Sequence, residues 1–244
     1  KMPYVLYNLG GVILNVITSL IFIVIYLISL WKLLSLAMIM SAIMGFASAV
    51  VNGIPMKVGD INNDGYNAVQ LGSDKDALKA LWVQLKMNGA LAEGIGIREM
   101  PEEWFESIDG KNDNPMITSI KVFYCNRLMA MHKFEQTKEE IKKVLESNMV
   151  LVGVYRHLLI CDYIYCELID GNIIEAEEFY TKDLQKFMKS MKKFPAILRT
   201  KYTYELLHNK DSKQAEKLRT LFNIMSEKYP YTSDIEAENE LMNI

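Results

Sequence analysis

Apolar residues fill most of the first 56 positions of the chain, and charged residues are nearly absent there. Residues 12–31 read VILNVITSLIFIVIYLISLW, which matches the about 20 residues that a helix needs to cross roughly 30 Å of hydrocarbon. A second run without charge covers residues 33–54, and Lys32 lies between the two runs. This pattern predicts a transmembrane helical hairpin over residues 1–56, with both ends on one side of the membrane.

Two other structures can give an apolar N-terminal run. A signal peptide has a shorter apolar segment and a basic leader, and Lys1 with Met2 makes a poor leader. A buried hairpin in a soluble core does not require two charge-free runs of this length. Membrane insertion is therefore the favoured interpretation. Because Lys1 and Lys57 lie on one side and Lys32 on the other, we expect an integral protein of the cell membrane with a cytosolic C-terminal domain.

Beyond residue 56 the pattern changes to polar loops and amphipathic helices. An Asp- and Asn-rich loop comes first, and leucine and tryptophan side chains then recur at helical spacing over residues 77–91. Little strand pattern follows. We therefore divide the chain into a transmembrane hairpin, a loop that leads into a helix, and a soluble helical domain: residues 1–56, 57–74 and 75–244.

Three segments of the soluble domain resemble one another. Each follows an apolar helix and a polar turn, and they align on Ile141, Phe179 and Leu218, which are 38 and 39 residues apart. This period lies in the range of stacked helical hairpins, each of which buries its apolar face only against a neighbour. The periodicity therefore predicts a helical-repeat array.

From about residue 116 onward the domain resembles tetratricopeptide repeats. The period here is longer than theirs, and Ala176 and Ala215 occupy the place of their small helix-packing residue. The predicted fold class is all-α, with a transmembrane helical hairpin followed by a soluble, tetratricopeptide-like helical-repeat domain. A plain helical bundle with coincidental periodicity is the alternative. Such arrays usually dock a protein partner.

The charge distribution disfavours one class of partner. Residues 57–244 contain 25 basic and 30 acidic residues without a concentrated basic segment, so we expect no nucleic-acid partner. The charge run KEEIKK at residues 138–143 predicts a solvated helix face.

Cysteine is sparse in this chain. Cys125, Cys161 and Cys166 are an odd number and do not form a disulfide framework, which fits a reducing compartment. His157 lies one helical turn before Cys161, but the segment around them is apolar. Buried core cysteines are therefore favoured over a metal site.

An acidic loop follows directly after the apolar hairpin. Residues 52–65 read NGIPMKVGDINNDG, and Asp60 and Asp64 are the first acidic residues of the chain. Ionisable side chains at membrane depth are rare, and such a residue is a candidate for a functional role. Pro55 cannot continue a helical hydrogen-bond ladder, and the adjacent glycines permit an open or sharply turned backbone. The loop is therefore the main candidate for a functional site.

Two stretches resemble motifs of the site-2 protease-like membrane zinc metallopeptidases. Residues 8–15, NLGGVILN, are followed by a transmembrane segment and resemble the small-residue motif of that family. Gly10 and Gly11 within it predict close helix packing. The segment NGIP at residues 52–55, followed by the Asp-Gly pair at residues 64–65, resembles the second catalytic motif.

The resemblance implies roles for single residues. In that family the Asn and the Pro of this motif lie in an unwound stretch beside the substrate, and the Asp before Gly is the third zinc ligand. Asn52 and Pro55 would therefore bind substrate, and Asp64 would ligate the zinc of the complete enzyme. Asp60 is the alternative ligand, since it has the family's usual spacing of eight residues from Asn52, although Ile61 follows it in place of Gly.

The HExxH motif of the family is absent from this sequence. The histidines are His132, His157 and His208, all far downstream of the matched motifs. The resemblance thus implies the C-terminal portion of an intramembrane zinc metalloprotease that cleaves protein or peptide substrates in or near the membrane. Upstream sequence would carry the two histidine ligands and the general base, and the chain alone would be inactive. A pseudo-protease, or a non-catalytic membrane-anchored scaffold that binds a protein partner, is the alternative.

Overall fold

The computed structural model describes residues 3–59, 61–106 and 114–244. These residues are mainly helical, and the chain separates into two compact units, Lys1–Lys79 and Ala80–Ile244. The helical prediction is therefore confirmed at the level of the all-α class. The exception within the described part is a two-residue antiparallel pair, β1 (Lys57–Val58) with β2 (Ile61–Asn62).

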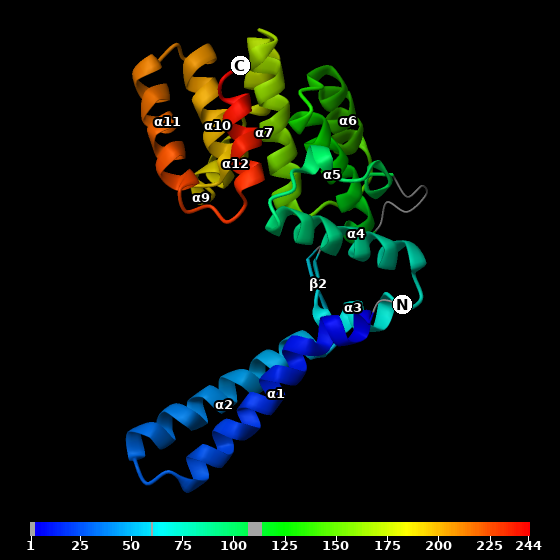
Figure 1. Cartoon of the computed structure of the whole chain (residues 1–244), viewed down its shortest axis with the longest axis vertical. Coiled ribbons are helices and arrows are strands. Elements are labelled where there is room, and N and C mark those ends of the chain that lie inside the picture. The colour runs from blue at the N-terminus through cyan, green and yellow to red at the C-terminus, as the bar shows by residue number, and fades with distance from the viewer. Residues whose placement is uncertain (1–2, 60, 107–113) are drawn as a thin grey trace. The chain divides into compact units, whose positions relative to one another are not determined.

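The first unit is built on two long apolar helices that run antiparallel and side by side (Figure 1). They are α1 (Tyr4–Ile28) and α2 (Lys32–Gly53), and both are long and apolar enough to cross a membrane. Across the turn between them, the Ser35 hydroxyl of α2 donates to the carbonyl oxygen of Ser29 at 3.3 Å. The hairpin that the apolar pattern predicts is present.

Small residues let α1 and α2 approach closely at one crossing. The Ser19 side chain of α1 is fully buried, and a Cβ added at Gly45 of α2 would lie 2.2 Å from its Oγ. By contrast, a Cβ added at Gly10 or Gly11 would meet no heavy atom within 4 Å. The prediction that these two glycines allow close helix packing is therefore wrong, because the backbones come close at Gly45 instead.

The second unit is a helical array. Its elements are α4 (Lys75–Ala92), whose first turn belongs to the other unit, η1 (Ile97–Glu99), η2 (Glu102–Trp104), α5 (Pro115–Ala130), α6 (Phe134–Glu146), α7 (Gly153–Ile169), α8 (Ile173–Phe179), α9 (Lys182–Ser190), α10 (Pro195–Thr203), η3 (Tyr204–His208), α11 (Ser212–Ser226) and α12 (Thr232–Leu241).

Helix α7 is the centre of this unit and packs against α5, α6, α8 and α10. In Figure 1 it lies between α5 and α6 on one side and α10 on the other. Because it has neighbours all round, its sequence is apolar over most of its length rather than amphipathic. Cys161, Ile164 and Leu168 belong to one core cluster, and Leu159 and Tyr163 belong to a second.

The three similar segments each form the second helix of a pair. They give α6 after α5, α8 after α7, and α11 after α10. The aligned position Ile141 is fully buried, as are the small residues Ala176 and Ala215. The middle pair departs from the pattern, because α8 has 7 residues and α9 follows it directly, whereas α6 has 13.

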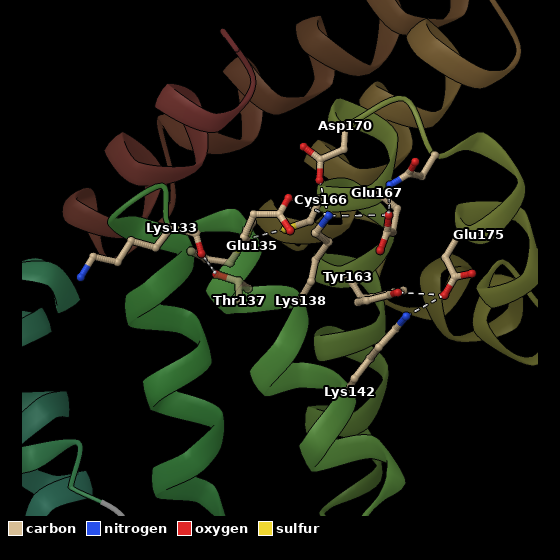
Figure 2. Close-up of polar contacts among 12 residues, drawn as sticks. Lys133, Glu135, Thr137, Lys138, Lys142, Tyr163, Cys166, Glu167, Asp170 and Glu175 are labelled. Carbon is tan, nitrogen blue, oxygen red and sulfur yellow. Dashed lines mark hydrogen bonds and ion pairs between the residues drawn. The ribbon is translucent and has the colours of Figure 1, made fainter.

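A polar cluster joins α6 to the next helix pair (Figure 2). The Lys138 side chain is only 12% exposed and pairs with Glu135, Glu167 and Asp170. Burial lowers the pKa of Lys138, but the hydrogen bonds to Asp170 and Glu135 outweigh this effect and raise the pKa overall. The prediction of a solvated charge run is therefore wrong at Lys138, which stays charged inside an interhelical contact.

Candidate functional site at the end of the second apolar helix

Helix α2 ends where the candidate loop begins. Its last residue is Gly53, and Ile54 is extended, with φ −76° and ψ 122°. Pro55 disfavours the helical conformation for the residue before it and donates no hydrogen bond, so the helix cannot continue. The chain then passes through the β1–β2 pair and enters a short helix, α3 (Asp64–Gln70).

Asn63 holds both ends of this loop with one side chain. Its Oδ1 accepts from the backbone N–H of Tyr66 and from that of Met56, both at 2.9 Å. Its Nδ2 donates to the carbonyl oxygens of Val51 at 2.8 Å and Ile54 at 2.6 Å. Asn63 thus caps α3 and also fixes the end of α2, because it gives hydrogen-bond partners to two N–H groups and two carbonyl oxygens at the junction.

The backbones of the two motif segments come into direct contact beside this cap. A Cβ added at Gly65 would lie 2.2 Å from the Gly53 carbonyl oxygen and 2.6 Å from its carbon. Only glycine permits this approach. On its other side, a Cβ added at Gly53 would lie 3.0 Å from Cγ1 of Val12 in α1. Three stretches that the sequence singled out therefore meet at Gly53: residues 8–15, 52–55 and 64–65.

The predicted site residues lie around this meeting point. Asn52 is exposed in the last turn of α2, and Pro55 is exposed in the extended segment. Asp64 is partly buried in the first turn of α3, where a carboxylate interacts favourably with the helix dipole. Asp60, the alternative ligand, lies outside the described residues. The sequence predicts a loop that leads into a helix over residues 57–74, and in the structure this helix begins at Asp64.

Asn63 is the residue that sequence reasoning missed. An Asn-Asp-Gly run is typical of a turn, and nothing local to it shows that the Asn side chain reaches back across the loop to Val51 and Ile54. Its position could have predicted the capping role, since Asn one residue before a helix is a favoured N-cap.

The described residues do not by themselves form a zinc site. Across residues 3–59, 61–106 and 114–244, no group of three or more His, Cys, Asp or Glu side chains is arranged to hold a metal ion. Asp64 would supply one ligand of the four that zinc usually takes.

The other histidine and cysteine positions have structural contacts. The Nδ1 and Nε2 of His157 lie 2.7 Å from the Gly153 carbonyl oxygen and 3.0 Å from an Asp183 carboxylate oxygen. Cys161 and Cys166 are fully buried, and burial raises the pKa of Cys161 to about 12, so its thiol stays protonated. These two cysteines are core residues, as the apolar pattern around them predicts.

Comparisons of this chain with protein-family models, with curated proteins and with solved structures find no match.

Replacing Asn63 by alanine is expected to loosen the loop, because two N–H groups and two carbonyl oxygens lose a partner together. We expect the loop to be less stable by about 1–3 kcal/mol, and the Met56 and Tyr66 amides to exchange about 5- to 100-fold faster. Hydrogen–deuterium exchange of the full chain in detergent micelles measures this.

Two further substitutions calibrate the exchange experiment. Asn63→Asp keeps the oxygen acceptor but loses both donors, so exchange should fall between wild type and Asn63→Ala. Asn62→Ala changes the neighbouring residue, which is not part of this hydrogen-bond set, and should leave both amides at the wild-type rate. If the Met56 and Tyr66 amides of Asn63→Ala exchange at the wild-type rate, Asn63 does not hold the two ends of the loop together.

Proposed function

We propose that this chain is the C-terminal portion of a membrane-embedded zinc metallopeptidase of the site-2 protease type. The observation that carries the proposal is the convergence of residues 8–15, 52–55 and 64–65 at Gly53. These stretches are separated in sequence. The first resembles the small-residue motif of that family, and the other two together resemble its second catalytic motif. Unrelated turns would have no reason to meet at one glycine, where Gly65 makes a backbone contact that only glycine allows and Val12 packs with its side chain.

The arrangement supports a division of roles at the junction. Asn52 and Pro55 flank the point where α2 unwinds, and both side chains are exposed, so a peptide strand would have access to them. Asp64 begins a helix that is fixed against α2 through Asn63 and Gly65, so its carboxylate would be held in place to serve as one metal ligand. The two histidine ligands and the general base would come from outside residues 1–244.

We further propose that α1 and α2 span the membrane and that the helical domain lies in the cytosol. Large apolar side chains of both helices remain exposed, including Leu27, Ile28 and Leu33. Lipid would cover such a surface. The helix pairs α5–α6, α7–α8 and α10–α11 would then act as a tetratricopeptide-like array that positions a protein substrate or regulator at the membrane face.

The test uses the full-length gene product in detergent micelles, with zinc content and cleavage of a membrane-peptide reporter as readouts. Asp64→Ala is expected to lose zinc and to lower cleavage by on the order of 100-fold or more, since even outer-shell changes cost 10- to 100-fold. Asp60→Ala serves as the matched comparison and should keep both properties. If Asp60→Ala alone abolishes them, Asp60 is the ligand.

A different result would favour the alternative class. A full-length protein that binds no zinc and cleaves no reporter would be a pseudo-protease or a membrane-anchored scaffold. In that case α1 and α2 would serve as the anchor, and the helical array would be the functional part.

A further inference from the structure

The helical domain contains a pocket of about 210 Å³ that has no role in the proposed peptidase site. It lies among α4, α5, α7, α10 and α12, within residues 80–244. Its wall is largely apolar, with Phe123, Leu158 and Phe194 among the contributors. Mostly apolar pockets with a few convergent polar groups are the usual form of a small-ligand site.

One buried arginine and three acids line this pocket. Arg199 of α10 is 1% exposed and donates a hydrogen bond to Asp162 of α7. Its Nη1 also lies 3.4 Å from Oε2 of Glu238, and its guanidinium lies over the Tyr165 ring at 4.7 Å. Asp234 adds a third carboxyl to the wall. The lining thus contains more acid than base.

The hydrogen bonding of this cluster is incomplete among the described residues. Nε of Arg199 and Oε2 of Glu238 are both buried, and neither has a hydrogen-bond partner there. Burial raises the pKa of Asp234, and it raises the pKa of Glu238 to about 7 against the opposing effect of Arg199. A cation that enters the pocket would favour the ionised form of both carboxyls and supply donors to them.

The side chains that line the pocket favour an organic ammonium ion over a metal ion. A divalent metal is a poor match, because the guanidinium of Arg199 sits among the carboxyls and the described residues hold no metal-binding group of three. The apolar wall, in contrast, suits an aliphatic chain. An ammonium group carries three hydrogen-bond donors, which the carboxyls of Asp234 and Glu238 can accept beside the single 3.4 Å contact from Arg199 to Glu238.

We propose that this pocket binds a primary ammonium group on a short alkyl chain, with the ammonium between Asp234 and Glu238 and the chain against the apolar wall. The ammonium could belong to a free alkylamine or to the lysine side chain of a peptide. This proposal does not rest on the proposed peptidase function, and a protein without zinc or cleavage would leave it intact.

The test is isothermal titration calorimetry of the full chain in detergent micelles at pH 8. The probes are n-butylammonium, Nα-acetyl-lysine N-methylamide and, as the neutral control, n-butanol. We expect both ammonium probes or one of them to bind, and butanol to bind at least about tenfold more weakly. Binding of the blocked lysine alone assigns the pocket to a peptide, and binding of butylammonium alone assigns it to a free amine.

Matched variants separate a binding role from a structural one. Glu238→Gln and Asp234→Asn keep the side-chain shape and should each weaken ammonium binding by about tenfold. Glu236→Gln makes the same change on the exposed side of the same helix and should have no effect. Unfolding curves of each variant verify that the domain is folded.

The pH dependence of ammonium affinity distinguishes a binding role of Glu238 from a merely structural one. Glu238 faces Arg199 from α10, Asp162 and Tyr165 from α7, and Tyr229 and Asp234 from its own end of the chain. Because its pKa is about 7, ammonium affinity should rise between pH 6 and pH 8 as the carboxylate forms, and Glu238→Gln should remove that rise. Equal binding of butanol and butylammonium, or no binding of either ammonium probe, would overturn the proposal.

Discussion

Replacing Arg199 by alanine should destabilise the helical domain by about 3–5 kcal/mol, the range for removing one partner of a buried ion pair. The guanidinium is 1% exposed and is the partner of Asp162, whose side chain is 9% exposed. Without the guanidinium, the carboxyls of Asp162 and Glu238 lose the positive charge that both of them contact. This loss is a large fraction of the about 5–15 kcal/mol by which a typical domain is stable.

Chemical denaturation of the full chain in detergent micelles, followed by far-ultraviolet circular dichroism, measures the loss. Arg98→Ala is the matched control, because Arg98 also pairs with a glutamate, Glu240, at 2.7 Å, but both side chains are 40% exposed. An exposed pair contributes at most about 1 kcal/mol. Similar unfolding curves for the two variants would show that burial of Arg199 has no energetic consequence.

The elements that dominate this fold are those with a strong local pattern. Two charge-free runs predict α1 and α2, and the spacing of apolar residues predicts the helix pairs of the second unit. The Arg199 cluster has no such pattern. Asp162 lies 37 residues before Arg199, and each charge by itself is typical of an exposed helical residue. Only the packing of α7, α10 and α12 brings these charges together.

The same limit applies at the end of α2. The sequence identifies Asn52, Pro55 and Asp64 as candidates because proline, glycine and acidic residues stand out beside an apolar run. It does not show that Gly53 and Gly65 touch, since a close backbone contact depends on how two helices cross. Nor does it show that the side chain of Asn63, the N-cap of α3, also bonds to α2. The bond from Asn63 to the Val51 carbonyl oxygen depends on where α2 lies, which no local pattern reveals.

Helix α3 should move away from the end of α2 when Gly65 is replaced by alanine. The added Cβ would lie 2.2 Å from the Gly53 carbonyl oxygen, and because this neighbour is backbone, a rotamer change cannot relieve the overlap. Overpacking of this kind costs about 1–3 kcal/mol. The loop between the two helices contains Lys57, whose peptide bond is a trypsin site, so cleavage there should become faster in proportion, by up to about 100-fold.

Limited trypsin digestion of the full chain in detergent micelles compares this variant with Gly89→Ala. Gly89 lies in α4, and a Cβ added there would meet no heavy atom within 4 Å. Alanine in an open helical position is neutral or stabilises by up to about 1 kcal/mol, so cleavage after Lys57 should stay at the wild-type rate. If Gly65→Ala is cleaved no faster than Gly89→Ala, the contact at Gly53 does not hold α3. If Gly65→Ala is cleaved faster, the zinc content of the full-length Gly65→Ala protein would show whether a displaced Asp64 still serves as a ligand.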